Sequence, residues 1–133
     1  MSFQKEKILI IGASGQIGIE LTETLSKLYG NDCVIISDLN TPIYSTNNTF
    51  EKLDALDKNA VFDLVKKHSI AQVYHLAAML SATGEKNPMF AWKLNMESLF
   101  HLLDLAKEKH IKQLYWPSSI AVFGPSTPAE NTP

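Results

Sequence analysis

The sequence contains no arginine and a single cysteine, Cys33, and none of its apolar runs is longer than a few residues. One cysteine excludes a disulfide framework within the chain and fits a reducing compartment. No apolar run approaches the roughly 20 residues that cross a bilayer. The N-terminus, from Met1 to Lys7, mixes charges and lacks the apolar core of a signal peptide. We therefore expect a cytoplasmic protein with no membrane partner.

An excess of either charge is also absent. The 12 basic residues are all lysine, and with 14 acidic residues they give a formal net charge of −2. The isoelectric point is near 6.0, so no basic field is present to attract nucleic acid, and we exclude it as a partner. The 133 residues suffice for one domain. Hydrophobic residues at 45% and charged residues at 20% are ordinary for a globular protein.

Short apolar runs alternate along the chain with segments of helical periodicity. The pattern predicts strands at residues 7–12, 33–37, 49–53, 71–76 and 113–116, and helices at 15–29, 59–68 and 88–109. The expected buried positions of the first helix are Ile17, Leu21, Leu25 and Leu28, and those of the last include Phe90, Leu94, Leu102 and Ala106. The alternation predicts an α/β fold, a Rossmann-type parallel sheet with helices on both faces. Ligands of such sheets bind at the carboxyl ends of the strands, so residues that directly follow strands are candidates for a site.

A glycine-rich loop joins the first predicted strand to the first helix. It reads Gly12-Ala13-Ser14-Gly15-Gln16-Ile17-Gly18, a G-x-x-G-x-x-G pattern. Glycine permits positive φ and leaves backbone N–H groups uncovered, and the N-terminus of the following helix favours an anion. A strand–helix turn that is glycine-rich for conformational reasons alone is the alternative. Because the loop follows a strand, opens a helix and precedes an acidic residue, we predict that it holds a dinucleotide pyrophosphate.

That acidic residue is Asp38, which follows Gly18 by 20 residues and ends the second predicted strand. A carboxylate there can accept hydrogen bonds from both hydroxyls of an adenosine ribose, and it would repel a 2′-phosphate. Sites that read this phosphate place an arginine nearby, and the chain has none. Asp38 therefore favours NAD over NADP. The alternative is an aspartate that caps a turn.

Six blocks of the sequence occur in the order typical of extended short-chain dehydrogenase/reductases. They are the glycine loop, Asp38, Asp54-Ala55, His75-Leu76-Ala77-Ala78, Asn95, and the segment from Ser118 to Gly124. The chain resembles these UDP-galactose-epimerase-like enzymes over nearly its whole length. Within them, residues 76–88, 91–96 and 116–125 are most similar to the short-chain-type L-threonine 3-dehydrogenases. Those enzymes oxidise the β-hydroxyl of L-threonine with NAD and yield 2-amino-3-ketobutyrate.

The resemblance implies roles for individual residues. NAD would contact Gly12, Ser14, Gly15, Gln16, Ile17, Gly18, Asp38, Asp54, Ala55, Leu76, Ala77, Ala78 and Asn95. Asp54 and Ala55 would contact its adenine, and Asn95 would support the active-site architecture. Ser119 would be the catalytic serine, which hydrogen-bonds the substrate hydroxyl, and Ser81 and Thr83 would face the amino-acid end of the substrate. No metal is implied, and a homodimer or higher oligomer is expected.

One part of the family's catalytic machinery is missing from the sequence. The base is a tyrosine followed four positions later by a lysine, which lowers the phenol pKa so that tyrosinate can accept a proton. The 133 residues contain no Tyr-x-x-x-Lys. We therefore expect the N-terminal half of an enzyme, a sheet incomplete at its C-terminal end, and little activity from this chain alone. A nucleotide-sugar epimerase or dehydratase, and a non-catalytic NAD-binding module, are the alternatives.

Overall fold

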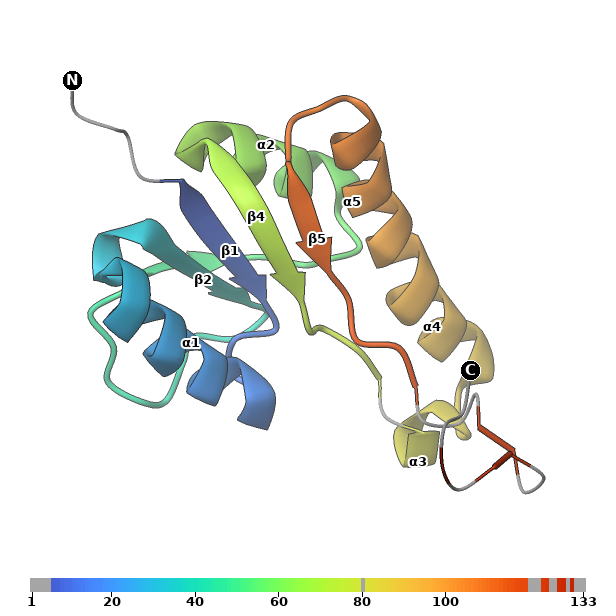
Figure 1. The fold of residues 1–133 in the computed structure, drawn as a ribbon. Coiled ribbons are helices and arrows are strands. Elements are labelled where there is room, and N and C mark those ends of the chain that lie inside the picture. Colours follow the sequence, from blue (N-terminus) through green and yellow to red (C-terminus); the bar gives the residue numbers. More distant parts are fainter. Residues whose placement is uncertain (1–5, 80, 120–122, 125–126, 129, 131–133) are drawn as a thin grey trace.

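The computed structural model describes residues 6–79, 81–119, 123–124, 127–128 and 130, without the side chains of 81 and 82. Five strands occur in it: β1 (Lys7–Ile11), β2 (Val34–Asp38), β3 (Thr49–Lys52), β4 (Ile70–His75) and β5 (Gln113–Tyr115). The helices are α1 (Gln16–Tyr29), α2 (Lys58–His68), α3 (Ser81–Gly84), α4 (Pro88–Trp92) and α5 (Ser98–Lys107). A 3₁₀ turn, η1 (Asn31–Cys33), precedes β2, and a π-helical turn, η2 (Lys93–Glu97), joins α4 to α5. Figure 1 shows their arrangement.

The strands form one parallel sheet in the order β3-β2-β1-β4-β5. β1 lies at the centre, with Leu9 paired to Ile35 on one side and to Val73 on the other. The chain crosses from one half of the sheet to the other between β3 and β4. Ligands bind at this switch point in Rossmann folds, beyond the carboxyl ends of the strands. The predicted fold class is confirmed.

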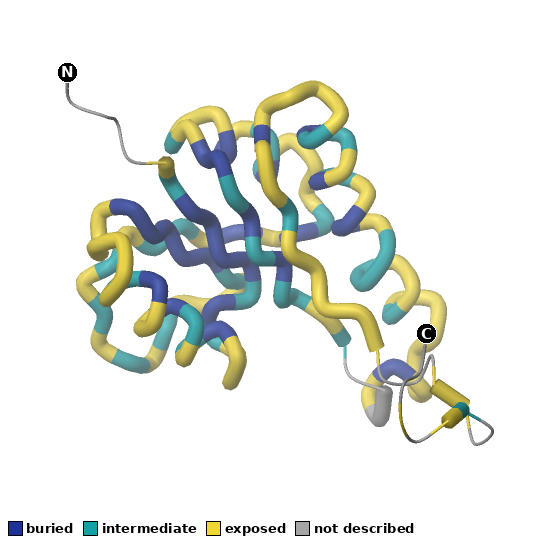
Figure 2. The backbone as a smooth tube through the Cα atoms, in the orientation of Figure 1, coloured by how far each residue is buried: buried dark blue, intermediate teal, exposed yellow. Residues whose placement is uncertain are grey.

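The central strands are buried on both faces, which is why they read as continuous apolar runs (Figure 2). Successive side chains of a strand point to opposite faces of the sheet. Leu9 and Ile11 pack with residues of α2 and α5, whereas Ile8 and Ile10 pack with Leu25 of α1. Helices thus cover both faces, as the sequence predicts.

The buried stripe of α1 is rotated from the predicted one. Gly18, Thr22 and Leu25 are its buried residues, and Ile17 and Leu28 are 66% and 69% exposed. The cause is a close approach at Gly18, where an added Cβ would lie 2.5 Å from the carbonyl oxygen of Gly12. The helix therefore contacts the sheet through its glycine side, and the prediction was wrong for Ile17 and Leu28.

The predicted helix at 88–109 is a helical run that ends at Lys107 and is interrupted by the π-turn η2. Leu102 is buried as expected, but Phe90 is 41% exposed. The short helix α3 was not predicted. Strand boundaries differ by at most one residue, and Cys33 lies in η1 rather than in β2. Within the described ranges, every helix is too short or too polar to span a bilayer.

Candidate functional site

A cleft of about 230 Å³ opens at the carboxyl ends of the central strands. The residues that line it are Ile11, Gly12, Gly15, Asp38, Leu39, Leu53, Asp54, Ala55, Leu76, Ala77, Ala78 and Leu94. Eight of the predicted cofactor residues are among them. Segments far apart in the sequence meet here because all the parallel strands end at this edge of the sheet.

The glycine loop is shaped by two close approaches. Gly12 has a φ of +86°, and an added Cβ would lie 2.6 Å from the backbone nitrogen of Ala77. Gly18 meets the loop backbone as described above. At Gly15 the nearest atom to an added Cβ is the Gly12 carbonyl oxygen, at 3.4 Å. Two glycines are therefore required by packing, whereas the third leaves space beside the N-terminus of α1.

Asp38 faces the glycine loop. Its Oδ2 accepts a hydrogen bond from the backbone N–H of Ser14 at 3.0 Å, and its Oδ1 accepts one from the backbone N–H of Leu39 at 2.8 Å. A carboxylate has about four acceptor positions, so acceptor capacity remains for ligand hydroxyls. The Ser14 hydroxyl oxygen is buried and has no hydrogen-bond partner among the described residues. An orphaned hydroxyl beside uncovered glycine backbone fits a ligand that brings phosphate oxygens.

Tyr44 contacts the glycine loop and was not among the residues predicted from the sequence. Its hydroxyl donates to the carbonyl of Ala13 at 3.2 Å. Burial, with a contribution from the charge of Asp38, raises the pKa of Tyr44 above its usual value, so the phenol keeps the proton that it donates. Asn48 holds the same segment, because its side-chain amide donates to Ser26 Oγ at 2.8 Å and to the Val34 carbonyl at 3.1 Å. No local pattern marks this segment, which reads as an ordinary polar loop.

Five predicted cofactor residues lie outside the lining of the cleft: Ser14, Gln16, Ile17, Gly18 and Asn95. Gln16 and Ile17 are exposed on the first turn of α1, and Gly18 is buried beneath the loop. Asp54 and Ala55 do line it. The Asp54 carboxylate accepts from the backbone N–H of Leu56 at 2.9 Å.

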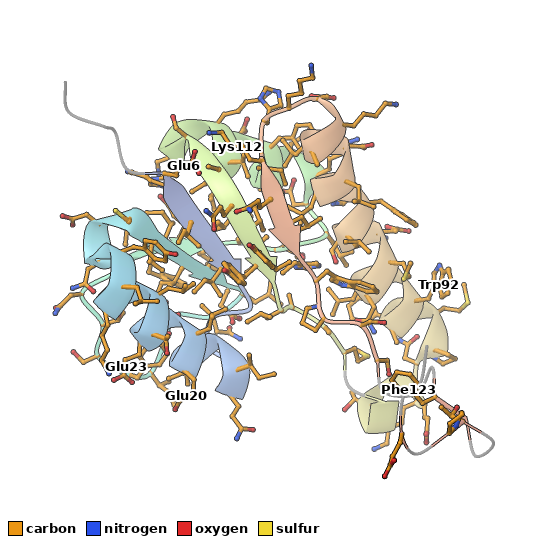
Figure 3. The ribbon with its side chains drawn as sticks, in the orientation of Figure 1. Glu6, Glu20, Glu23, Trp92, Lys112 and Phe123 are labelled. Atoms are coloured by element: carbon orange, nitrogen blue, oxygen red, sulfur yellow. The ribbon has the colours of Figure 1, made fainter. Side chains whose placement is uncertain are left out.

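A second cavity of about 700 Å³ adjoins the first, and Ala78 lines both. The predicted catalytic residue Ser119 lines this cavity, together with Met79, Asn95, Trp92 and Trp116. The two tryptophans are partly open to solvent: Trp116 is 38% exposed and Trp92 is 64% exposed. Figure 3 shows Trp92 projecting from the lower end of the α4–α5 run, away from the sheet.

Asn95 lines this second cavity rather than the cleft. Its side-chain oxygen accepts from the backbone N–H of Met79 at 2.8 Å, and its amide donates to the Met79 carbonyl at 3.3 Å. Asn95 therefore holds the backbone of Met79 beside this cavity, and both roles expected for it stay predictions. Thr83 is exposed on α3 and does not line the cavity, and the side chain of Ser81 lies outside the described residues.

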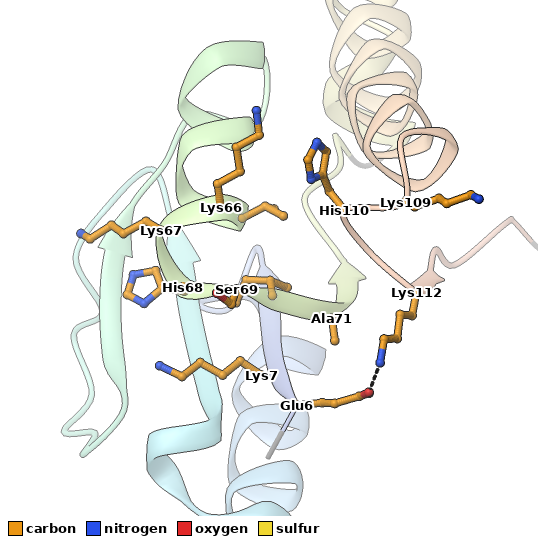
Figure 4. Close-up of a pocket in the computed structure, with 12 residues that line it drawn as sticks. Glu6, Lys7, Lys66, Lys67, His68, Ser69, Ala71, Lys109, His110 and Lys112 are labelled. Atoms are coloured by element: carbon orange, nitrogen blue, oxygen red, sulfur yellow. Dashed lines mark hydrogen bonds and ion pairs between the residues drawn. The ribbon is translucent and has the colours of Figure 1, made fainter. Parts of the chain in front are cut away.

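A third cleft, of about 620 Å³, lies at the opposite edge of the sheet and contains no predicted site residue (Figure 4). Its lysines and histidines belong mainly to the last turns of α2 and α5 and the residues that follow them, where cations interact favourably with the helix dipole. Several are paired: Lys112 with Glu6, and Lys67 with Glu51 at 2.7 Å. Dipole and ion pairs explain this basic cleft.

The chain is similar over nearly its whole length to known proteins. The sequence profile of the NAD dependent epimerase/dehydratase family matches residues 8–133. An uncharacterized epimerase/dehydratase of Staphylococcus saprophyticus is 48% identical over 131 residues, which are 96% of this chain and 41% of that protein.

Among similar solved structures, the threonine dehydrogenases named here have a higher sequence identity to this chain than the sugar-nucleotide epimerase. A GalE-like L-threonine dehydrogenase from Cupriavidus necator is 51% identical with a TM-score of 0.88, over 96% of this chain and 41% of that one. The L-threonine dehydrogenase of Clostridium difficile is 44% identical with a TM-score of 0.86, over the same shares. A nucleoside-diphosphate-sugar epimerase from Agrobacterium tumefaciens is 26% identical with a TM-score of 0.77, over 95% and 41%. This chain thus spans about two fifths of the length of these relatives.

Proposed function

The chain belongs to the NAD dependent epimerase/dehydratase family, and from this premise we propose that its cleft binds NAD. The single observation that carries the proposal is the hydrogen bond between the Asp38 carboxylate and the backbone N–H of Ser14 at 3.0 Å. It fixes an acidic group beside a glycine loop whose central residue, Gly15, leaves space at a helix N-terminus. Ribose hydroxyls and a pyrophosphate need these two features side by side.

The residues of the cleft divide the cofactor among them. Ser14 and Gly15 would contact the pyrophosphate, and the Ser14 hydroxyl would gain the hydrogen bond that it lacks among the described residues. Asp38 would accept from the adenosine ribose, and Asp54 and Ala55 would contact the adenine. NAD, when bound, supplies an acceptor for hydride.

For the complete enzyme we propose oxidation of L-threonine to 2-amino-3-ketobutyrate. In its support, the threonine dehydrogenases are 44% and 51% identical to this chain, against 26% for the sugar-nucleotide epimerase. Ser119 lines the cavity that adjoins the cleft at Ala78. There its hydroxyl would hydrogen-bond the β-hydroxyl of the substrate and hold it towards the nicotinamide end of the cleft.

These 133 residues contain no Tyr-x-x-x-Lys, so no tyrosinate of that type is present to accept the substrate proton. We expect NADH production from L-threonine by this chain to be close to background. Robust turnover would show that another group acts as the base.

Isothermal titration with NAD and with NADP tests the binding proposal. We expect NAD to bind and NADP to bind at least about tenfold more weakly, because a 2′-phosphate would stand against the Asp38 carboxylate. Asp38→Ala should remove most of the NAD affinity. Asp32→Ala is the matched control, because Asp32 is an exposed aspartate in η1 outside the lining of the cleft. Equal affinity for the two nucleotides, or an unchanged affinity in Asp38→Ala, would contradict the assignment.

A further inference from the structure

His75 is buried at the end of β4 and belongs to neither cavity lining. Its Nε2 lies 2.7 Å from the hydroxyl oxygen of Ser98, the first residue of α5. Both residues are only 1% exposed. The same hydroxyl donates to the carbonyl of Leu94, one helical turn earlier.

The number of protons available to these three groups determines the tautomer of His75. Ser98 has one hydroxyl proton, and a carbonyl oxygen can only accept. The hydroxyl proton therefore goes to Leu94, and the Nε2 of His75 must be the donor to the serine oxygen. Desolvation, with the nearby His101, lowers the pKa of His75 to about 4, so the ring is neutral at pH 7 and carries its proton on Nε2.

The Leu94 carbonyl belongs to the π-turn η2. A π-turn bonds each carbonyl to the N–H five residues later instead of four, and a serine hydroxyl that bonds to a carbonyl four residues earlier favours bending of a helix. The Ser98 hydroxyl thus stabilises the irregular turn, and His75 holds that hydroxyl in place.

The next residue of the turn is Asn95, whose side chain holds both backbone groups of Met79. Met79 follows β4, as His75 ends it, so two connections tie this segment to the helical run: His75 to Ser98, and Met79 to Asn95. Met79 and Asn95 line the same cavity as Ser119.

We propose that His75, as the Nε2–H tautomer, is a positioning residue that acts through Ser98 and the Leu94 carbonyl to hold η2, and thereby sets the cavity wall formed by Asn95 and Met79. The inference rests on the proposed function only where it treats this cavity as the substrate site.

Amide hydrogen exchange of this chain, followed by NMR, tests the connection. In Ser98→Ala, exchange of the Met79 amide should accelerate at least tenfold relative to the amide of Ile10 in β1, which reports global opening. Ser98→Thr keeps the hydroxyl and should restore the protection. The matched control is Thr22→Ala, because Thr22 is also buried and its hydroxyl donates to the carbonyl four residues earlier, Gly18, at 2.7 Å. It should leave the relative exchange of Met79 unchanged.

The ¹⁵N spectrum of His75 in the unmodified chain supplies a second readout that does not depend on any variant folding. We expect a protonated Nε2 and an unprotonated Nδ1 at pH 7. An Nδ1–H tautomer, or relative Met79 exchange that is the same in Ser98→Ala as in the unmodified chain, would overturn the proposal. Neither measurement requires NAD or L-threonine, so a failure of this proposal is distinguishable from a failure of NAD binding.

Discussion

At the scale of single residues, we expect substitution of Gly15 to affect NAD binding and substitution of Gly18 to affect the stability of the fold. An added Cβ at Gly18 would lie 2.5 Å from the Gly12 carbonyl oxygen, whereas at Gly15 the nearest contact is an ordinary 3.4 Å. We expect Gly18→Ala to lower the free energy of unfolding by about 1–3 kcal/mol, as overpacking does. Gly15→Ala should change it by less than about 1 kcal/mol, the range of helix-cap substitutions, while weakening NAD binding at least about tenfold.

Urea denaturation and calorimetric titration of the two glycine variants check this prediction. Each variant serves as the control for the other, because both add one methyl group to the same loop. Equal losses of unfolding free energy in the two variants would show that the loop backbone shifts to accommodate the methyl group at Gly18.

The pKa of His75 predicts a pH dependence of stability. Burial lowers this pKa from 6.5 to about 4 in the folded chain. The unfolded state therefore binds a proton first as pH falls, and the stability that the neutral buried ring contributes is present above pH 6.5 and lost towards pH 4. In that window the slope from this residue approaches about 1.4 kcal/mol per pH unit.

His75→Gln removes the titrating imidazole and replaces it with a side-chain amide, whose N–H can donate to Ser98. The difference in unfolding free energy between wild type and variant, measured by urea denaturation from pH 7 to 4, should shrink with falling pH. A constant difference would mean that the ring does not titrate as its burial requires.

At the scale of elements, α2 begins with a side-chain cap. The Oδ1 of Asp57 accepts from the backbone N–H of Ala60 at 3.0 Å. Asp57→Ala should lower the free energy of unfolding by about 1 kcal/mol, and Asp57→Ser, which retains a capping oxygen, should recover most of it. Urea denaturation measures both. A destabilisation as large in Asp57→Ser would assign the effect to something other than the cap.

Elements with local signals were predictable from the sequence. β1, β4 and the glycine turn are marked by apolar runs and glycines, and the alternation of strands and helices predicts the parallel Rossmann-type sheet. The exposure of Ile17 follows instead from a backbone contact at Gly18. The π-turn depends on contacts of Asn95 and Ser98 with partners 16 and 23 residues away, which no periodicity reveals. The catalytic role of Ser119 stays a prediction, because geometry places it in a cavity without testing its chemistry.

At the scale of the whole molecule, large apolar side chains remain exposed along the α4–α5 run. Trp92 is 64% exposed, Phe100 49% and Leu103 45%. Large exposed apolar side chains on one helical run favour association through that run. We expect concentration-dependent self-association in sedimentation velocity, consistent with the predicted homodimer, and a shift to monomer in Phe100→Asp combined with Leu103→Asp.

Leu28→Asp provides the control for this pair, because Leu28 is 69% exposed at the far end of α1. It should leave the sedimentation coefficient unchanged. A wild-type chain that stays monomeric at every concentration would contradict the assignment of the patch.

The fit between Gly12 and the backbone of Ala77, where an added Cβ would lie 2.6 Å from the nitrogen, has a kinetic consequence. The loop after β1 and the segment after β4 lie against each other without any side chain between them, so we expect these two parts of the cleft to move little relative to each other. A nucleotide that arrives therefore meets a preformed groove. Its observed association rate should rise linearly with concentration, without the plateau that a slow opening step would impose.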